Sequence, residues 1–348
     1  MNSITRKFVS LLLLSGAGYS LNAMNCEKDF ASERLENNKE TGFVPVQRFK
    51  AASYGLTCAT FSPDGKTILT GSKKKTACLW DFKTGALIRT FEGHTQGINT
   101  VAFNADGETI LTGSEDGYAQ LWNSKTGDLI RTIVKEEYPI RSIACNSKGE
   151  AVLSSDRGVL IFWNTKKEEF VRVKDDIKLN CAITSVAFSP DEKTIVIGVS
   201  TRGYAYLVDV TTKNVVRTFD RYPTAPEKNM WSTSWINCVA FSPDGKTVLA
   251  GVDDKIAYLW NAETGELVRT FENGHANSIT SVAFSPKGNT ILTGGHDGKL
   301  CIWDSNTGDL LHLTTITYSV CSVAFSPDGN FILAGLITGE VVVWKINQ

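Results

Sequence analysis

The stretch Gly93–Ile133, GHTQGINTVAFNADGETILTGSEDGYAQLWNSKTGDLIRTI, contains the pattern from which most of the chain is built. Turn sequences rich in Gly, Asn, Asp and Ser divide it into four short apolar runs, at residues 98–103, 109–112, 118–122 and 128–133. Runs of this length, bounded by such turns, predict four β-strands joined by tight turns. Apolar residues occupy both odd and even positions of the first run. We therefore expect both faces of this sheet to be covered.

The same pattern recurs along the chain. The turn after the first run appears seven times, at residues 62–65, 104–107, 146–149, 189–192, 242–245, 285–288 and 326–329. A landmark in the third run follows each turn, as Trp80, Trp122, Trp163, Val208, Trp260, Trp303 and Trp344. Repeats of this size each form one supersecondary unit that stacks on its neighbours. We predict seven similar four-stranded sheets.

Four side chains of the quoted stretch keep the same spacing in one other repeat. His94, Thr112, Asp116 and Trp122 recur as His275, Thr293, Asp297 and Trp303. With the Gly-His start and the Trp-Asp or Trp-Asn end of the third strand, this spacing resembles the WD40 repeat family. The resemblance implies a β-propeller with a buried tetrad that locks a blade. In that tetrad the indole N–H of Trp122 meets Thr112, which meets His94, which meets Asp116.

Other repeats depart from this tetrad. Lys74 stands at the Asp position of the first repeat, and Ala250 stands at the Thr position of the fifth. The fourth repeat has Val208 in place of Trp and Arg202 in place of Asp. We expect apolar packing to hold these blades together, because burial contributes about 25 cal/mol per Å² of apolar area.

The two ends of the repeat array complete each other. The segment Thr41–Phe49, TGFVPVQRF, resembles the fourth strands at residues 84–91 and 264–271 with one residue inserted. The last repeat ends after its third strand, at residues 340–344, and has no fourth strand of its own. We therefore predict an all-β, seven-bladed β-propeller over residues 41–348, whose N-terminal strand completes the last blade. Such closure removes exposed sheet edges.

Residues 1–23 have the features of a signal peptide, with a basic start, an apolar core at residues 8–14 and small residues up to Ala23. The apolar core is too short to span a bilayer. Residues 24–40 form a polar linker. We predict an exported protein, periplasmic or secreted, with no membrane span after cleavage. Attachment to the membrane through an uncleaved signal, or through lipid on Cys26, is the alternative.

Composition and motifs give no indication of chemistry. The chain has 348 residues, 36 basic and 37 acidic side chains, and a net charge of -1, which provides no basic surface for nucleic acid. The four histidines lack metal-ligand spacing, and no phosphate-binding loop or nucleophile elbow is present. We predict no catalytic residue, metal or cofactor. The eight cysteines are scattered singly, which is typical of free buried thiols.

One segment is exceptional in length. Between the fourth strand of the fourth repeat and the first strand of the fifth, the chain inserts a loop carrying Tyr222, Met230, Trp231 and Trp235. Long loops in compact domains are usually functional or disordered, and aromatic residues are preferred anchors of interfaces. We predict a partner-binding site here. The alternative is that the tryptophans fold back over the central channel.

In a propeller this loop shares one rim with the turns between second and third strands. Those turns carry Lys73–Lys75, Arg157 and Arg202, which would form a basic arc suited to an acidic partner. The alternative is an ordinary solvated surface.

We predict a non-enzymatic scaffold, a monomeric propeller within a complex, that binds a protein or peptide on this rim. Two other functions stay open. One is a small-ligand binder or enzyme at the channel mouth, lined by Arg157, Arg202 and the loop aromatics. The other is a structural envelope component.

Overall fold

The computed structural model describes residues 43–53, 55–164, 169–173, 181–201, 203–221 and 234–346. The chain divides into two units, Met1–Asn37 and Asn38–Gln348, and every described residue belongs to the second. No helix with the length and hydrophobicity of a membrane-spanning segment occurs in this described part. Several predictions lie outside it: the signal peptide, the linker, and the site residues Arg202, Tyr222, Met230 and Trp231.

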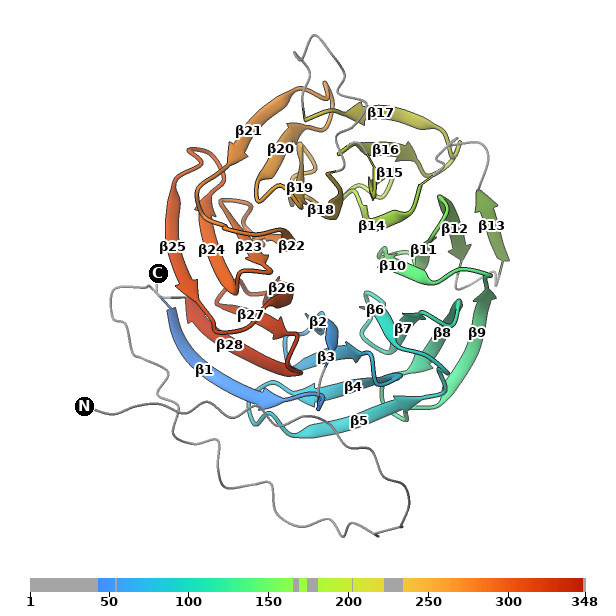
Figure 1. Ribbon diagram of the computed structural model, residues 1–348. Coiled ribbons are helices and arrows are strands. Elements are labelled where there is room, and N and C mark those ends of the chain that lie inside the picture. Colours follow the sequence, from blue (N-terminus) through green and yellow to red (C-terminus); the bar gives the residue numbers. More distant parts are fainter. Residues whose placement is uncertain are drawn as a thin grey trace, which may run out of the picture. The chain divides into compact units, whose positions relative to one another are not determined.

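The described residues form seven four-stranded antiparallel sheets around a central opening, which confirms the predicted propeller (Figure 1). Blades 1 to 6 follow chain order from β2 to β25, four strands to each blade. Blade 7 combines β26, β27 and β28 with β1. Within each blade the strands follow one another outward from the opening.

The innermost strands of blades 1 to 7 are β2 (Leu56–Phe61), β6 (Ile98–Phe103), β10 (Ile140–Cys145), β14 (Ile183–Phe188), β18 (Ile236–Phe241), β22 (Ile279–Phe284) and β26 (Val320–Phe325). The second strands are β3 (Thr67–Ser72), β7 (Thr109–Ser114), β11 (Glu150–Ser155), β15 (Thr194–Val199), β19 (Thr247–Val252), β23 (Thr290–Gly295) and β27 (Phe331–Leu336). The third strands are β4 (Thr76–Asp81), β8 (Tyr118–Asn123), β12 (Val159–Asn164), β16 (Ala205–Asp209), β20 (Ala257–Asn261), β24 (Lys299–Asp304) and β28 (Glu340–Ile346). The outer strands are β5 (Leu87–Glu92), β9 (Leu129–Lys135), β13 (Glu169–Val173), β17 (Val215–Phe219), β21 (Leu267–Phe271), β25 (Leu310–Thr315) and β1 (Phe43–Lys50).

The second strands are buried on both faces. Ile68 and Leu69 are consecutive residues of β3, so their side chains point to opposite faces, and both are 0% exposed. Ile68 packs in a cluster with Leu333 and other blade 7 residues, whereas Leu69 packs with Ile98 and other blade 2 residues. Consecutive apolar residues in one strand therefore require a neighbouring sheet on each side.

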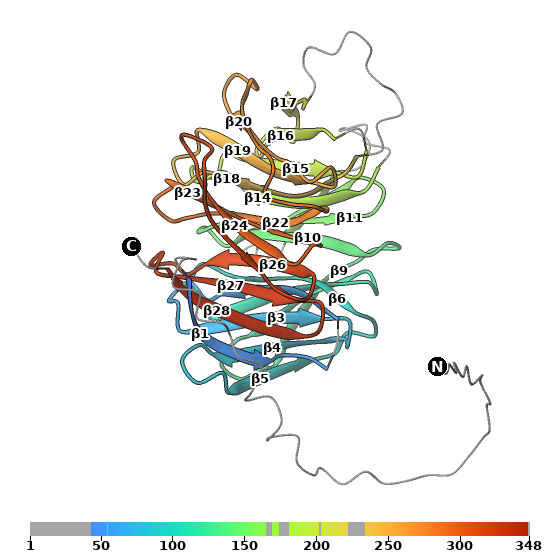
Figure 2. The same ribbon diagram turned by 60° about the vertical axis from the view of Figure 1, so that its left-hand side comes forward.

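The ring closes where the chain ends meet. β1 pairs antiparallel with β28, with Gln47 opposite Val343 and Lys50 opposite Glu340. In Figures 1 and 2 the blue N-terminal strand lies beside the red C-terminal one. A register shift between Pro45 and Gln47 absorbs the inserted residue. This pairing confirms the predicted closure.

Hydrogen bonds join the innermost strands near one end of the channel. The second residue of such a strand donates to the first carbonyl of the next blade, as Thr57 Oγ1 does to Ile98 O at 2.6 Å. Asn237 Nδ2 donates in the same way to Ile279 O at 2.9 Å. Blades 3 and 7 differ: Arg141 of blade 3 pairs with Asp156 at 2.8 Å, and the Cys321 thiol of blade 7 donates to the Gly335 carbonyl of its own blade at 3.1 Å. The bonds made by Thr57 and Asn237 connect a side chain of one blade to the main chain of the next, although the two blades share no sheet.

Arginines on the outer strands join the same blades at the periphery. The Arg89 guanidinium donates to the Lys125 carbonyl of blade 2 at 2.6 Å. Arg269 of blade 5 makes the equivalent bond to the Asn306 carbonyl of blade 6, at 2.5 Å, and a second one to the Thr307 carbonyl. The Arg89 side chain lies against Gly127, where a Cβ would fall 2.6 Å from Arg89 Cδ. Glycine is therefore required at this turn, both for its φ of 84° and for the close approach of the arginine.

Blades 3 and 4 are joined differently. Lys213 stands at the glycine position of the blade 4 turn, with a φ of 63°. Its ammonium lies 3.6 Å from the centre of the Phe162 ring of blade 3. At this seam the side chain of the later blade reaches the earlier one, whereas the arginines reach from the earlier blade to the later one. Arg172 of blade 3 pairs with Glu136 instead.

We expect deletion of residues 1–50, which removes β1, to lower the thermal midpoint by about 10 °C or more, at roughly 2 to 4 °C per kcal/mol. The deletion leaves β28 as an open edge and removes the cover of blade 7. Deletion of residues 1–40 retains β1 and is the control. Calorimetry of both proteins measures the effect, and equal midpoints would show that β1 does not close the ring.

We expect Gly127→Ala to destabilise the protein by about 1 kcal/mol more than Gly107→Ala. Both glycines have positive φ, 84° and 70°, so both variants carry backbone strain. A Cβ at Gly107 has its nearest neighbour at 3.8 Å, but at Gly127 it displaces Arg89 and breaks the bond to Lys125. Urea denaturation measures the difference. The difference in stability should disappear when each substitution is made separately in an Arg89→Ala background. If it persists there, the contact between Arg89 and Gly127 is not its cause.

Candidate functional site

One rim of the propeller carries the turns between second and third strands and the links from each outer strand to the next inner strand. In blade 2 a buried tetrad ties these two kinds of segment together. Trp122 Nε1 donates to Thr112 Oγ1 at 2.8 Å, and Thr112 Oγ1 lies 2.8 Å from His94 Nε2. His94 Nδ1 lies 3.0 Å from Asp116 Oδ2. Because the carboxylate only accepts, the His94 proton sits on Nδ1 and the Thr112 hydroxyl donates to Nε2.

Blade 6 repeats this arrangement. Trp303 Nε1 donates to Thr293 Oγ1 at 3.0 Å, His275 Nε2 lies 2.7 Å from that hydroxyl, and His275 Nδ1 lies 3.1 Å from Asp297 Oδ1. Blade 1 keeps only the first of these bonds, from Trp80 to Thr70 at 2.9 Å. The structure thus assembles two complete tetrads, in the two repeats whose sequences keep all four residues.

Burial sets the charge states of these groups. It lowers the pKa of His94 and of His275, and the neighbouring carboxylates only partly oppose it, so both rings are neutral near pH 7. Burial disfavours the charged form of Asp116, but the N–H groups of Tyr118 and Thr95 and the His94 ring outweigh it, so the pKa of this carboxyl lies below its usual value. Each tetrad is a neutral imidazole on a fixed anion, and its role is structural.

We expect the thermal midpoint to fall as the pH is lowered from 7.5 to 5.5. The pKa of each tetrad histidine is below 6.5 in the folded chain, so the unfolded chain takes up protons first and stability is lost on acidification. The tetrad aspartates have lowered pKa values and contribute only at more acidic pH. A variant with His94→Gln and His275→Gln should be less stable at pH 7.5 but should lose less between the two pH values. Differential scanning fluorimetry measures both, and an unchanged slope would contradict this account.

Blade 5 has a different buried network, which sequence reasoning did not foresee. Arg221 is 3% exposed, and its Nη1 donates to Asp254 Oδ2 at 2.7 Å. The Tyr258 hydroxyl donates to the same oxygen at 3.0 Å. Tyr258 lies opposite Ala250 in the β19–β20 pairing, so the small residue at the Thr position accommodates a ring. Burial raises the pKa of Asp254, although Tyr258 and Arg221 oppose the rise. The signals in the sequence were Ala250 and Arg221, two residues after the end of β17.

The exceptional long segment begins and ends on this network. Arg221 is the last described residue before it and is fixed to Asp254. After it, the Trp235 N–H donates to Asp253 Oδ1 at 2.9 Å, and the Asp253 N–H donates to Trp235 O at 3.1 Å. The Trp235 side chain is 51% exposed. Both ends of the segment are therefore held by the β19–β20 turn. Trp235, the tryptophan of this segment that the structure describes, is accessible to solvent.

The basic residues of the predicted arc stand on the same rim, in turns of different blades. Lys74 is exposed in the β3–β4 turn. Arg157 is exposed in the β11–β12 turn, with a φ of 65° and its guanidinium 4.9 Å from the centre of the Tyr138 ring. The blade 2 turn between them carries Glu115 and Asp116. Lys74 and Arg157 thus flank an acidic turn, so the basic surface is divided.

The described residues contain no group of three or more His, Cys, Asp or Glu side chains placed to hold a metal ion. His296 and Ser319 are in contact on the rim, Nδ1 to Oγ at 2.7 Å. Among the described residues, no carboxylate forms a hydrogen bond or ion pair with this exposed ring. The seven cysteines in the described part of the chain are free thiols.

Comparison with known families agrees with this geometry. The family model described as WD40, "WD domain, G-beta repeat", matches residues 43–81, 85–123, 228–261, 265–304 and 310–345, more than half of the chain. The chain belongs to the WD40 family. It is also similar to WD repeat-containing protein 82 of Drosophila melanogaster, at 32% identity over 114 residues. That similarity covers 32% of this chain and 33% of the relative, so it spans about a third of the relative's length. WD40 propellers are typically non-enzymatic scaffolds that bind protein partners.

Proposed function

We propose that this WD40 propeller is an exported, non-enzymatic scaffold that binds a protein or peptide partner on the blade 5 side of the rim. The observation that carries the proposal is Trp235, an aromatic side chain that is 51% exposed on an anchored stretch of main chain. Exposed tryptophan on a fixed support is typical of interface anchors, because little freedom is lost when a partner covers it.

The anchoring at blade 5 supports the same conclusion. In the Arg221–Asp254 ion pair the arginine side chain is buried, and the Tyr258 hydroxyl also donates to the aspartate. Removing one member of the pair therefore leaves an unpaired charge. The rim turn at Asp253 and Asp254 is thus held in one conformation by side chains from three segments. Tyr222, Met230 and Trp231, which lie between these anchors in the sequence, extend the proposed surface.

The charged side chains on the rim suggest how a partner is selected. Lys74 and Arg157 are exposed, and Arg202 occupies the equivalent turn position in blade 4. We propose that they favour a partner with acidic groups. Exposed charges of this kind mainly accelerate encounter and exclude unsuitable partners, and they add little to affinity.

Export is part of the proposal. It rests on residues 1–23, whose basic start, apolar core and small residues before Ala23 have the pattern of a cleavable signal. The mature propeller would act in the periplasm or outside the cell.

A photo-crosslinking amino acid in place of Trp235 tests the site in the full chain produced by its native host. We expect a discrete crosslinked partner, whose capture is lost when Trp231→Ala is added. The matched control places the same amino acid at Tyr318, which is 43% exposed on the same rim between blades 6 and 7. Capture of the same partner from both positions, or from neither, would contradict a binding site at blade 5. Calorimetry of each variant shows whether the propeller is intact.

A further inference from the structure

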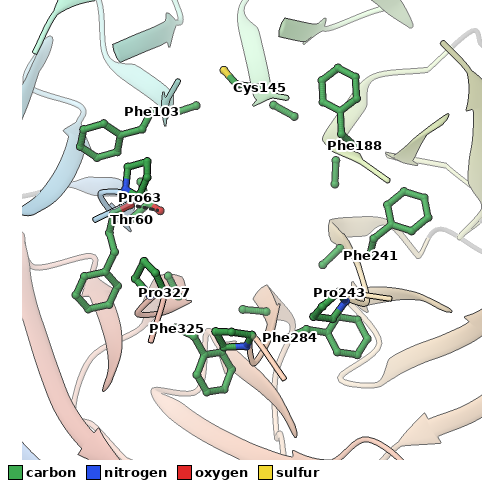
Figure 3. A pocket seen from close by; sticks show the side chains of 18 of the residues that line it. Thr60, Pro63, Phe103, Cys145, Phe188, Phe241, Pro243, Phe284, Phe325 and Pro327 are labelled. Carbon is green, nitrogen blue, oxygen red and sulfur yellow. Dashed lines mark hydrogen bonds between the residues drawn. The ribbon is translucent and has the colours of Figure 1, made fainter. Parts of the chain in front are cut away.

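The opposite end of the channel holds a cavity of about 610 Å³ that the rim site does not use. Because the innermost strands run away from the rim, their last two residues lie at this end, and all seven blades contribute to the wall. Six blades end this strand with Phe, whereas blade 3 ends it with Cys145. In Figure 3 the labelled side chains surround an open centre, and the rings of Phe103, Phe188 and Phe241 point away from it. We call this space the channel-end cavity.

No carboxylate, ammonium, guanidinium or imidazole is present among the described residues that line it. The wall consists of Ala, Val, Phe, Pro, Ser and Thr side chains together with Cys145. Burial raises the pKa of the Cys145 thiol to about 12, so this group is neutral as well. A charged ligand would lose its hydration here without gaining a counter-charge.

The serine hydroxyls of the wall already have acceptors. Ser62 Oγ donates to Asp64 Oδ1 at 2.6 Å, and Ser326 Oγ donates to Asp328 Oδ1 at 2.5 Å. Ser285 Oγ lies 3.0 Å from Asn289 Oδ1 and donates to it. The polar groups left for a ligand are therefore main-chain groups of the innermost strands and the Thr60 hydroxyl, whose contact with Phe61 O is 3.5 Å. A few hydrogen bonds are available, but no strong polar site.

Contacts between neighbouring blades surround the mouth of the cavity. The prolines at the strand ends pack on the turn glycines of the next blade, so that a Cβ at Gly65 would lie 3.4 Å from Pro327 Cδ. A Cβ at Gly288 would lie 3.3 Å from Pro243 Cδ. Between blades 3 and 4, where proline is absent from the blade 3 turn, the Ser147 N–H donates to Glu192 Oε1 at 2.6 Å instead. A preformed space binds ligands with a smaller ordering cost.

We propose that the channel-end cavity binds an uncharged small molecule that has both apolar and hydrogen-bonding groups. Its volume lies within the range of about 300 to 1,000 Å³ typical of small-molecule sites. The half-exposed alanines of the wall, among them Ala187 and Ala283, leave the space open. This site is on the other end of the propeller from Trp235, so a ligand bound there does not contact the proposed partner-binding residue.

Nile red, an uncharged apolar fluorophore, is the probe. We expect saturable binding with one site per chain, and an affinity at least tenfold weaker in Ala187→Trp and in Ala283→Trp, because either indole takes up part of the cavity. The matched control is Ala276→Trp, an exposed alanine on the rim, which should bind as the unaltered protein does. Equal affinity in all four proteins, or an equal loss in the control, would overturn the proposal.

A second measurement does not depend on whether the tryptophan variants fold. The unaltered chain is photolabelled with a neutral alkyl diazirine, with and without saturating Nile red, and the labelled peptides are mapped. We expect protected label on the peptides that contain residues 60–63, 187–190 and 283–286. Label confined to the exposed apolar residues of the outer strands, such as Leu87 and Ile88, which are 52% and 45% exposed, would refute the cavity site.

Discussion

Every blade of this propeller depends on having a neighbour on both faces. The second strands show the constraint most clearly, since consecutive residues such as Val248 and Leu249 are both 0% exposed and pack in different clusters. A stack with two free ends would expose one such face at each end. The β1–β28 pairing avoids this, because it makes the last blade complete and brings it against the first. The stability of the ring is therefore a property of the closed circle, and each local bond adds to a structure that burial has already specified.

Within that circle the polar contacts are unevenly distributed. Blades 2 and 6 have full tetrads, and blade 5 substitutes Arg221, Asp254 and Tyr258. The seam between blades 3 and 4 lacks the usual contacts both at its inner edge, where Arg141 pairs with Asp156, and at its outer edge, where Lys213 replaces a glycine. The family model also leaves residues 124–227 unmatched, which include most of these two blades. The fold tolerates this divergence because the apolar faces remain complete there.

The two ends of the channel have opposite chemical character. The rim carries exposed charges and Trp235 on main chain that is fixed by buried polar networks, which suits recognition of a macromolecule. At the other end, prolines of several blades pack on turn glycines around a cavity without charged side chains, which suits an uncharged small molecule. One rigid ring thus separates two surfaces, and each can vary without disturbing the other.

The sequence by itself determined the number of blades, the closure of the ring and the membership of both tetrads. These features depend on spacing along the chain, because the turn after the first strand and the aromatic landmark in the third recur at regular positions. It also singled out Trp235 through the length of its loop. The Arg221–Asp254–Tyr258 network, the arginine contacts between blades and the channel-end cavity were decided only by the tertiary structure. Each of them joins residues from different strands or blades, and the residue types involved have no fixed spacing that a single sequence could display. The cavity in particular is lined by ordinary residue types such as Ala, Phe and Pro. They come to line one space only because seven strand ends meet around one axis.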